Sequence, residues 1–303
     1  AEGKLRRVGK KNVRCFPASE ETADIRPEPA VQEELPQAEE ETGQYRAFSG
    51  LVGADGSLKY QLRVAMAAVA YPPNGLNMLI TGSTGSGKSH FARTIWEYAK
   101  ETKALCGAHA PIPFVEFNCA EYADNPQLLL SHLFGYKKGA FTGALEDKPG
   151  LVEQANGGIL FLDEINCVSE TLMPAILQML QNKTFGVHAL PEGWMIAAAG
   201  NPPRYNQSAR SFDMATLDRV RRIDLEPSLA VWQDYAAAHG VHPAVLAYLR
   251  LHPEHFFICD AQRAAGSFVT ARGWEDLSAL LLTYEALGFA CTQTQVREYL
   301  HVA

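Results

Sequence analysis

The chain of 303 residues contains 47% hydrophobic and 20% charged residues and carries a net charge of -7. At ~150 residues per domain, this length predicts about two domains, with a core that needs no disulfide or metal. An evenly acidic surface would repel nucleic acid, so any DNA contact must be local. No stretch approaches the ~18 apolar residues of a membrane span, and the six cysteines show no C-x-x-C pair and no metal-ligand spacing. We therefore expect a cytoplasmic protein with reduced thiols and no membrane contact.

Two unlike charged segments lie near the start of the chain. Residues 1–15 carry six basic residues and one acidic residue, whereas residues 20–41 carry nine acidic residues and one arginine. The acidic segment also contains three prolines and few large apolar residues, so its burial cannot offset its ordering entropy. We expect residues 17–47 to form a disordered acidic linker. The basic segment predicts two short strands, 4–8 and 13–16, around a tight turn, and a solvated basic tail is the alternative.

From Phe48 onward, apolar segments alternate with segments of helical periodicity. Continuous apolar runs are typical of parallel strands that are covered on both faces. Such runs occur at 76–81, 114–118, 158–164, 195–201 and 222–225. Helices are expected at 90–99, from Asp124 or Asn125 to Phe134, and from Ser169 toward Gln181, with a hairpin over 184–196 that turns at 191–193. The alternation predicts an α/β domain over 48–226, built on a parallel five-stranded sheet between helices.

Beyond Pro227 the pattern is helical only. Helices are expected at 230–238, 243–251, 274–287 and 293–301. Residues 227–303 are therefore predicted to form a second, smaller, all-helical domain.

A glycine-rich loop directly follows the first predicted strand of the α/β domain. It consists of Gly82, Ser83, Thr84, Gly85, Ser86, Gly87, Lys88 and Ser89, the P-loop pattern in its strand–loop–helix context. The glycines let backbone N–H groups point at phosphate oxygens, and the following helix adds its positive N-terminus. We expect Lys88 to contact the β- and γ-phosphates of ATP and Ser89 to bind Mg²⁺.

Polar residues end two further strands. Asp163 and Glu164 follow the apolar run 158–162, at the edge of a parallel sheet where ligands bind. Asp163 fits as the Mg²⁺ partner, and Glu164 as the base that polarises the attacking water. Asn201 ends the next strand and could orient the same water. Without a P-loop, the acidic pair would equally suggest a helix start, and Asn201 a turn before Pro202.

These parts, in this order, resemble the AAA+ ATPases. The hexapeptide Gly139, Ala140, Phe141, Thr142, Gly143 and Ala144 matches the GAFTGA loop of bacterial enhancer-binding proteins, which activate RNA polymerase carrying sigma-54. Together with 48–54, 71–76, 117–120 and 133–144, it makes residues 1–160 similar to the LevR-type regulators. Outside this longer match, the hexapeptide would simply suggest a flexible loop.

The resemblance implies several roles. Phe141 and Thr142 would lie at the tip of a loop that grips sigma-54, and Asn118 would relay the nucleotide state through Glu164. LevR-type regulators carry a winged helix ahead of the AAA+ domain, so residues 1–16 are expected to be the end of such a wing. DNA contact would then come only through that N-terminal domain. A ring homo-oligomer, as a hexamer, is also implied.

The second half of the chain resembles a different branch. Residues 162–171, 180–186, 191–194, 198–203, 216–223 and 268–277 look like the MoxR-type AAA+ ATPases, ring ATPases that remodel proteins. The change falls near residue 160, in a strand that both branches share.

Two arginines are expected to contact the phosphates of a bound nucleotide. Enhancer-binding proteins carry two arginines six residues apart, but here Asp213 stands at the first position and Arg219 at the second. The MoxR pattern needs only the arginine of Leu-Asp-Arg, so the resemblance implies that Arg219 reaches a neighbour's γ-phosphate. Arg272 matches the lid arginine that senses the nucleotide in cis. A surface salt bridge is the alternative for each.

Three functions fit these features. The first is ATP-driven remodelling of sigma-54 RNA polymerase, supported by the GAFTGA loop. The second is the remodelling of another protein client, as the MoxR resemblance suggests. The third is nucleotide binding without turnover, which Pro174 in an expected helix and Asp213 leave open.

The remaining histidines and tryptophans are expected to be structural. His239 and His242, and likewise His252 and His255, have a spacing that lets side chains meet on a helix face. No carboxylate or cysteine is expected to complete a zinc site there. Trp194, Trp232 and Trp274 are expected to pack in the core or between domains.

Overall fold

The computed structural model describes residues 5–8, 14–17, 45–72, 75–105, 112–140, 144–185, 188–189, 194–203, 220–259 and 268–300. The chain divides into two compact units, residues 1–39 and residues 40–303. In the first unit, strands β1 (Leu5–Val8) and β2 (Arg14–Pro17) pair antiparallel, with Val8 opposite Arg14. This pairing confirms the predicted basic hairpin. Most of the expected linker, residues 18–44, lies outside the described residues.

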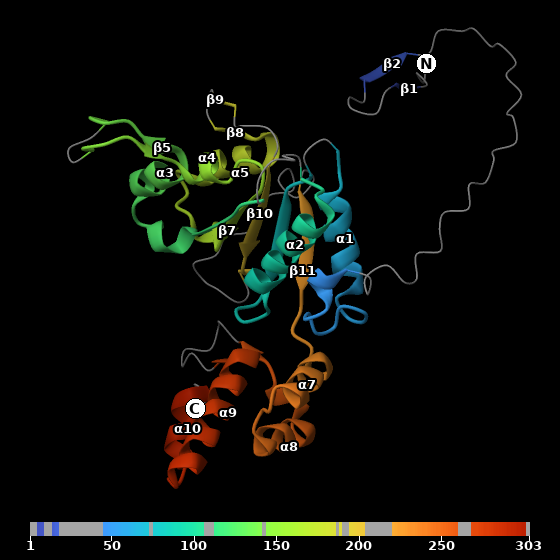
Figure 1. Cartoon of the computed structure of the whole chain (residues 1–303), viewed down its shortest axis with the longest axis vertical. Coiled ribbons are helices and arrows are strands. Elements are labelled where there is room, and N and C mark those ends of the chain that lie inside the picture. Colours follow the sequence, from blue (N-terminus) through green and yellow to red (C-terminus); the bar gives the residue numbers. More distant parts are fainter. Residues whose placement is uncertain are drawn as a thin grey trace, which may run out of the picture. The chain divides into compact units, whose positions relative to one another are not determined.

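The second unit is built around a five-stranded parallel sheet (Figure 1). Its strand order is β11-β3-β10-β7-β4, and every neighbouring pair is parallel. The bounds are β3 (Met78–Gly82), β4 (Phe114–Asn118), β7 (Ile159–Asp163), β10 (Met195–Gly200) and β11 (Arg221–Leu225). All five predicted strands are therefore confirmed to within two residues at each end.

Helices cover both faces of the sheet because its side chains alternate between two apolar clusters. On one face, Met78 and Ile80 of β3 pack with residues of α1 (Lys59–Val69) and α2 (Lys88–Thr102). On the other face, Leu79 packs with residues of α3 (Pro126–Phe134), α4 (Leu151–Gln154) and α5 (Met173–Asn182). The expected α/β core is confirmed, but the sequence analysis did not anticipate α1.

Two expected elements differ from the structure. Helix α5 begins at Met173 and not at Ser169, so Pro174 lies in its first turn, where the missing N–H costs no hydrogen bond. The proline therefore does not break the helix. The expected hairpin over 184–196 is wrong: β8 (Thr184–Phe185) pairs with β9 (His188–Ala189), which places the turn before His188. Residues 195–196 belong instead to β10, because this apolar strand pairs with β3 and β7.

The C-terminal segment forms its own apolar cluster, which includes Trp232, Leu249, Phe256 and Trp274. Its helices are α7 (Leu229–Ala238), α8 (Pro243–Leu251), α9 (Ala271–Leu287) and α10 (Gln293–Leu300) (Figure 1). The all-helical expectation is wrong in one detail, because β12 (Ile258–Cys259) and β13 (Phe268–Val269) pair antiparallel. We call residues 227–300 the lid. None of the helices in the described part of the chain is long and apolar enough to cross a bilayer.

At Gly135, the backbone lies unusually close to the neighbouring strand at the base of the loop that contains residues 139–144. Gly135 begins β5 (Gly135–Tyr136), which pairs antiparallel with β6 (Lys148–Pro149). Its φ of 72° and ψ of -175° define a backbone region that is essentially restricted to glycine. A Cβ at this position would lie 2.2 Å from the carbonyl oxygen of Lys148.

We therefore expect Gly135→Ala to lower the free energy of unfolding by ~1–3 kcal/mol. Urea denaturation followed by circular dichroism measures this change. Gly56→Ala is a suitable control, because the nearest atom to its added Cβ would lie at an ordinary 3.9 Å. Equal stability of Gly135→Ala and the unsubstituted protein would contradict the expected strain.

Candidate nucleotide site

The loop between β3 and α2 has the backbone of an anion cradle. Gly85 and Gly87 adopt φ values of +78° and +85°, which side-chain-bearing residues rarely adopt. The first N–H groups of α2 have no acceptor within the helix and are available to an anion. The hydroxyl oxygens of Ser83 and Ser86 are buried without a hydrogen-bond partner among the described residues. These orphaned polar groups fit a phosphate ligand, whereas Thr84 is exposed.

Lys88 holds the cradle together at its centre. Its Nζ donates to the carbonyl oxygens of Gly82 at 3.1 Å and Ser83 at 2.9 Å, and to Asn201 Oδ1 at 2.7 Å. Burial lowers the pKa of Lys88, and the nearby charges of Asp163 and Glu164 oppose that shift. The ammonium group is thus preorganised beside two carboxylates and the loop backbone.

Ser89 and the acidic pair meet at the same sheet edge. Ser89 Oγ donates to Asp163 Oδ2 at 2.9 Å, and the backbone N–H of Glu164 donates to Asp163 Oδ1, also at 2.9 Å. A hydroxyl and a carboxylate oxygen are the hard ligands that Mg²⁺ prefers, so this pair fits the ion. Glu164 has a φ of 47°, an uncommon conformation for a residue other than glycine.

Asn201 connects the lysine to the glutamate. Its Oδ1 accepts from Lys88, and its Nδ2 lies 3.5 Å from Glu164 Oε1. The Asn201 backbone oxygen accepts from Asn166 Nδ2 at 2.6 Å. Asn201 is 2% exposed, so its amide is held in one orientation. The structure thus brings Lys88, Ser89, Asp163, Glu164 and Asn201 together.

Asn118 lies nearby but faces other partners. It ends β4 opposite Asp163 of β7 in the sheet register. Its side-chain oxygen accepts from the Ala120 N–H at 3.0 Å, and its Nδ2 lies 3.4 Å from Glu121 Oε1. Since the amide is engaged with Glu121 here, the expected relay from Asn118 through Glu164 stays a prediction.

Of the two expected arginines, the structure describes only Arg272. Arg272 lies in the first turn of α9, and its charge contributes to lowering the pKa of Lys88. The lid thus brings a second cation to the phosphate loop. Arg219 and Asp213 lie outside the described residues.

A cavity of about 250 Å³ adjoins the phosphate loop and was not anticipated by the sequence analysis. The residues that line it come from the segment before α1, from the P-loop, from α2, from the end of β11 and from the lid, and include Leu51, Val52, His90, Trp232 and Tyr235. Trp232 is buried, and its Nε1 donates to Glu275 Oε1 at 3.2 Å. An apolar wall with a few polar groups suits a flat aromatic base. The packing role expected of the three tryptophans is confirmed, because Trp194 and Trp274 are also buried in apolar clusters.

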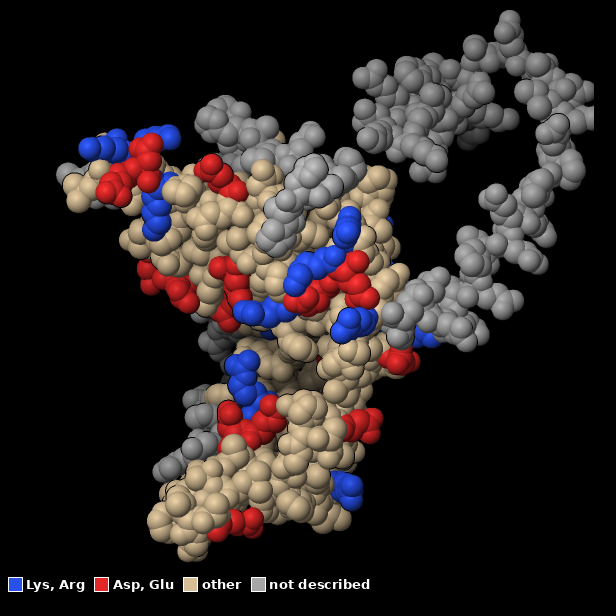
Figure 2. Space-filling model, in the orientation of Figure 1, with Lys and Arg blue, Asp and Glu red and all other residues tan. Residues whose placement is uncertain are grey.

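The loop with the hexapeptide is closed at its base by Asp147. Asp147 Oδ2 pairs with Lys137 Nζ at 3.0 Å, and its Oδ1 accepts from the Lys138 N–H at 2.7 Å. Gly139 donates from its N–H to the carbonyl of Ala144 at 2.9 Å. Figure 2 shows basic and acidic side chains gathered at the outer end of this hairpin. Residues 141–143, which include Phe141 and Thr142, lie outside the described residues.

The family described as "Sigma-54 interaction domain" matches residues 51–188. The matched range contains the P-loop, Asp163, Glu164 and the GAFTGA hexapeptide. Residues 51–188 are thus similar to a sigma-54 interaction domain. This similarity agrees with the AAA+ ATPase pattern of that part of the chain and confirms the resemblance to the enhancer-binding branch.

Proteins with similar sequences support the match to the sigma-54 interaction domain. The transcriptional regulatory protein LevR of Bacillus subtilis is 63% identical over 116 residues, covering 38% of this chain and 12% of LevR. DagR of Salmonella typhimurium is 47% identical over 147 residues, covering 48% of this chain and 15% of DagR. ZraR of Salmonella typhi is 34% identical over 191 residues, covering 59% of this chain and 39% of ZraR. The matches thus span well under half of each relative.

Among solved structures, NtrX from Brucella abortus in complex with ATP aligns with a TM-score of 0.49 at 20% identity, covering 80% of this chain and 54% of NtrX. The match to the sigma-54 interaction domain ends at residue 188, beyond the expected change of resemblance near residue 160. The MoxR-like character of the remaining residues stays a prediction.

Proposed function

We propose that the chain binds Mg·ATP at residues 82–89 and couples its hydrolysis to the remodelling of sigma-54 RNA polymerase. The observation that carries this proposal is the meeting of Lys88, Ser89–Asp163 and Glu164 inside a domain that also contains the GAFTGA loop. The phosphate cradle would bind the nucleotide, and the GAFTGA loop would transmit the resulting motion to sigma-54.

Each group has a distinct task in this proposal. Lys88 neutralises the β- and γ-phosphates, while Ser89 and Asp163 would hold Mg²⁺, which supplies further charge neutralisation when bound. Glu164 accepts a proton from the attacking water, and Asn201 orients the glutamate through its amide. Arg272 senses the phosphates from the lid, and the cavity beside Trp232 takes the base.

Assembly completes the site. Arg219 is proposed to act on the γ-phosphate of a neighbouring copy, which requires a ring homo-oligomer, and a hexamer is the expected form. Any DNA contact is proposed to involve the basic hairpin of residues 4–16 and not the acidic body.

Measurements of ATP turnover and of sigma-54 binding distinguish the candidate functions. We would measure ATP hydrolysis, and the binding of sigma-54 in the presence of ATP or a transition-state analogue, with Lys88→Ala as the control that lacks the phosphate-binding cation. Turnover together with analogue-dependent capture supports the proposal. Turnover without capture would redirect it to another protein client, as the MoxR resemblance suggests. Tight ATP binding without turnover in the assembled protein would leave a nucleotide-binding module.

Thr142→Ala is expected to weaken sigma-54 capture at least ~10-fold if Thr142 is one of the few hot-spot residues of the interface, whose truncation costs ~2 kcal/mol or more. ATP turnover without sigma-54 should be unchanged, since the loop lies outside the phosphate cradle. A pull-down titration with the transition-state analogue measures the loss. Thr283→Ala on the exposed face of α9 is the matched control and should capture normally. Equal capture by both variants would remove the proposed role of the loop.

A further inference from the structure

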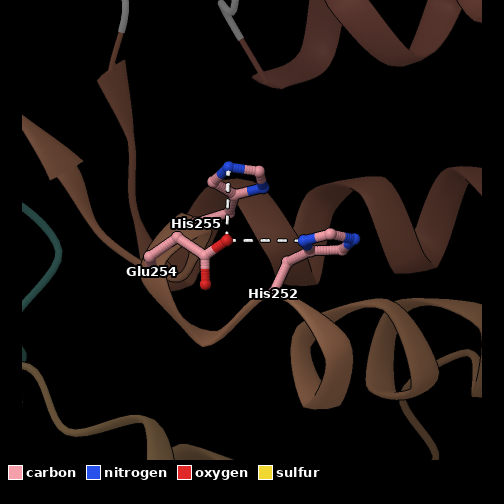
Figure 3. Close-up of side chains that lie close together, drawn as sticks. All are labelled: His252, Glu254 and His255. Carbon is pink, nitrogen blue, oxygen red and sulfur yellow. Dashed lines mark hydrogen bonds and ion pairs between the residues drawn. The ribbon is translucent and has the colours of Figure 1, made fainter.

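A cluster of two histidines and a glutamate lies at the end of α8 in the lid. His252 caps the helix, and a single turn of 3₁₀ helix, Pro253–His255, follows it directly. Figure 3 shows Glu254 directing one carboxylate oxygen into the space between the two imidazole rings. Glu254 Oε1 lies 3.4 Å from His252 Nδ1 and 3.9 Å from His255 Nε2. The carboxylate that the sequence analysis did not expect is therefore present.

We propose that His252, Glu254 and His255 form a binding site for a divalent first-row transition-metal ion, with Zn²⁺ as its representative. One ligand atom from each residue lies within 4.8 Å of the other two. Three ligands of a tetrahedral zinc ion, at ~2.0–2.2 Å from the metal, lie about 3.3–3.5 Å apart. Small side-chain rotations are sufficient to close the remaining gap.

The local backbone preorganises the ligands. The backbone N–H of His255 donates to the carbonyl oxygen of His252 at 3.1 Å, which closes a 3₁₀-type turn between the two residues. The rings of His252 and His255 accordingly stack, with centroids 5.3 Å apart and planes 14° from parallel. The turn is anchored to the lid core, because Phe256 is buried and its carbonyl oxygen accepts from Trp274 Nε1 at 3.1 Å.

Tyr248 supplies the second-shell contact that a histidine ligand needs. Its hydroxyl oxygen lies 2.7 Å from His255 Nδ1. When Nδ1–H donates to that oxygen, the tautomer leaves a lone pair on Nε2, on the side of Glu254. A ligating histidine is usually oriented by this kind of bond from its other nitrogen.

The chemistry of the set selects the kind of ion. Two imidazoles and one carboxylate suit Zn²⁺, Ni²⁺ or Cu²⁺, whereas Mg²⁺ prefers an all-oxygen shell. The three side chains are 40% to 61% exposed, so water can take the open coordination position. The site differs in both place and ligand type from the Mg²⁺ site proposed at Ser89 and Asp163. A bound ion would connect the end of α8 to the turn that precedes β12.

Calorimetric titration of the full 303-residue chain with Zn²⁺, without nucleotide or affinity tag, tests the site. We expect one equivalent to bind, and we expect Glu254→Gln to weaken the affinity at least ~10-fold and His252→Asn/His255→Asn to abolish binding. Tyr248→Phe should weaken it by ~10-fold, as is typical for loss of an outer-shell partner. His239→Asn removes another lid histidine, whose Nδ1 contacts a backbone oxygen of its own helix, and should bind normally.

Co²⁺ spectroscopy distinguishes this site from the cysteines. Imidazole and carboxylate ligation gives weak visible bands, whereas a thiolate adds an intense near-ultraviolet band. We expect the weak visible bands of imidazole and carboxylate ligation, and we expect these bands to be absent in His252→Asn/His255→Asn. Unaltered Zn²⁺ affinity in His252→Asn/His255→Asn, a thiolate spectrum, or no binding below ~1 mM would each overturn the proposal. Unchanged circular dichroism of the variants ensures that a loss of binding reflects lost ligands.

Discussion

Replacing Glu164 with glutamine is expected to lower ATP turnover by ~10²–10⁴-fold, the usual contribution of a positioned general base. Glutamine keeps the size and the hydrogen-bonding oxygen that faces Asn201 Nδ2, but it cannot accept the proton of the attacking water. The phosphate cradle, centred on Lys88, does not depend on this carboxylate for its hydrogen bonds. ATP affinity should therefore stay within a few fold of that of the unsubstituted protein.

Two measurements separate catalysis from binding in this variant. Steady-state phosphate release gives the turnover, and titration with a fluorescent ATP analogue gives the affinity. Glu153→Gln, on the exposed surface of α4, is the matched control and should hydrolyse ATP normally. Turnover by Glu164→Gln within threefold of normal would mean that another group activates the water. A parallel collapse of affinity would instead assign Glu164 a structural role.

The fold and the phosphate-binding motif were predictable because both depend on short-range sequence features. A buried parallel strand is a run of apolar residues, and the P-loop is one continuous segment between such a strand and a helix. Asp163 ends the strand that pairs with β4 and β10, so its place at the sheet edge came from the strand prediction alone. The helix α5 was predicted with its start misplaced, because Pro174 permits a first turn but does not specify its beginning.

Features that depend on packing between distant segments, or on the exact geometry of a turn, were not predictable. The cavity beside the P-loop combines Leu51 and Trp232, which are far apart in the chain, so no local pattern indicates it. The side chain of Asn118 turns to Glu121, a choice that depends on the 3₁₀ turn after β4. Likewise, the spacing of His252 and His255 did not reveal the 3₁₀ turn after α8 that stacks the two rings and places Glu254 between them.

Arg219→Ala is expected to reduce ATP turnover by ~10³–10⁵-fold, the range reported for loss of an arginine finger. The argument for action in trans comes from the strand that follows it. Arg221 begins β11 opposite Met78, whereas Leu225 lies opposite Gly82, where the P-loop starts. Four residue steps of ~3.3 Å place the start of β11 about 13 Å from that end of the sheet. The described strand that follows Arg219 in sequence therefore begins at the sheet edge opposite the phosphate loop.

Mixing two inactive variants tests this geometry. Arg219→Ala copies retain Lys88, and Lys88→Ala copies retain Arg219, so a mixed ring rebuilds complete sites at some of its interfaces. We expect the mixture to recover measurable turnover, although each variant alone is inactive. Arg222→Ala is the matched control, because this exposed arginine pairs with Asp224 at 2.9 Å in its own strand and its loss should change turnover little. A deficient Arg219→Ala variant whose activity is not recovered by mixing would place the arginine in its own site, because only a residue donated across an interface can be supplied by the other copy.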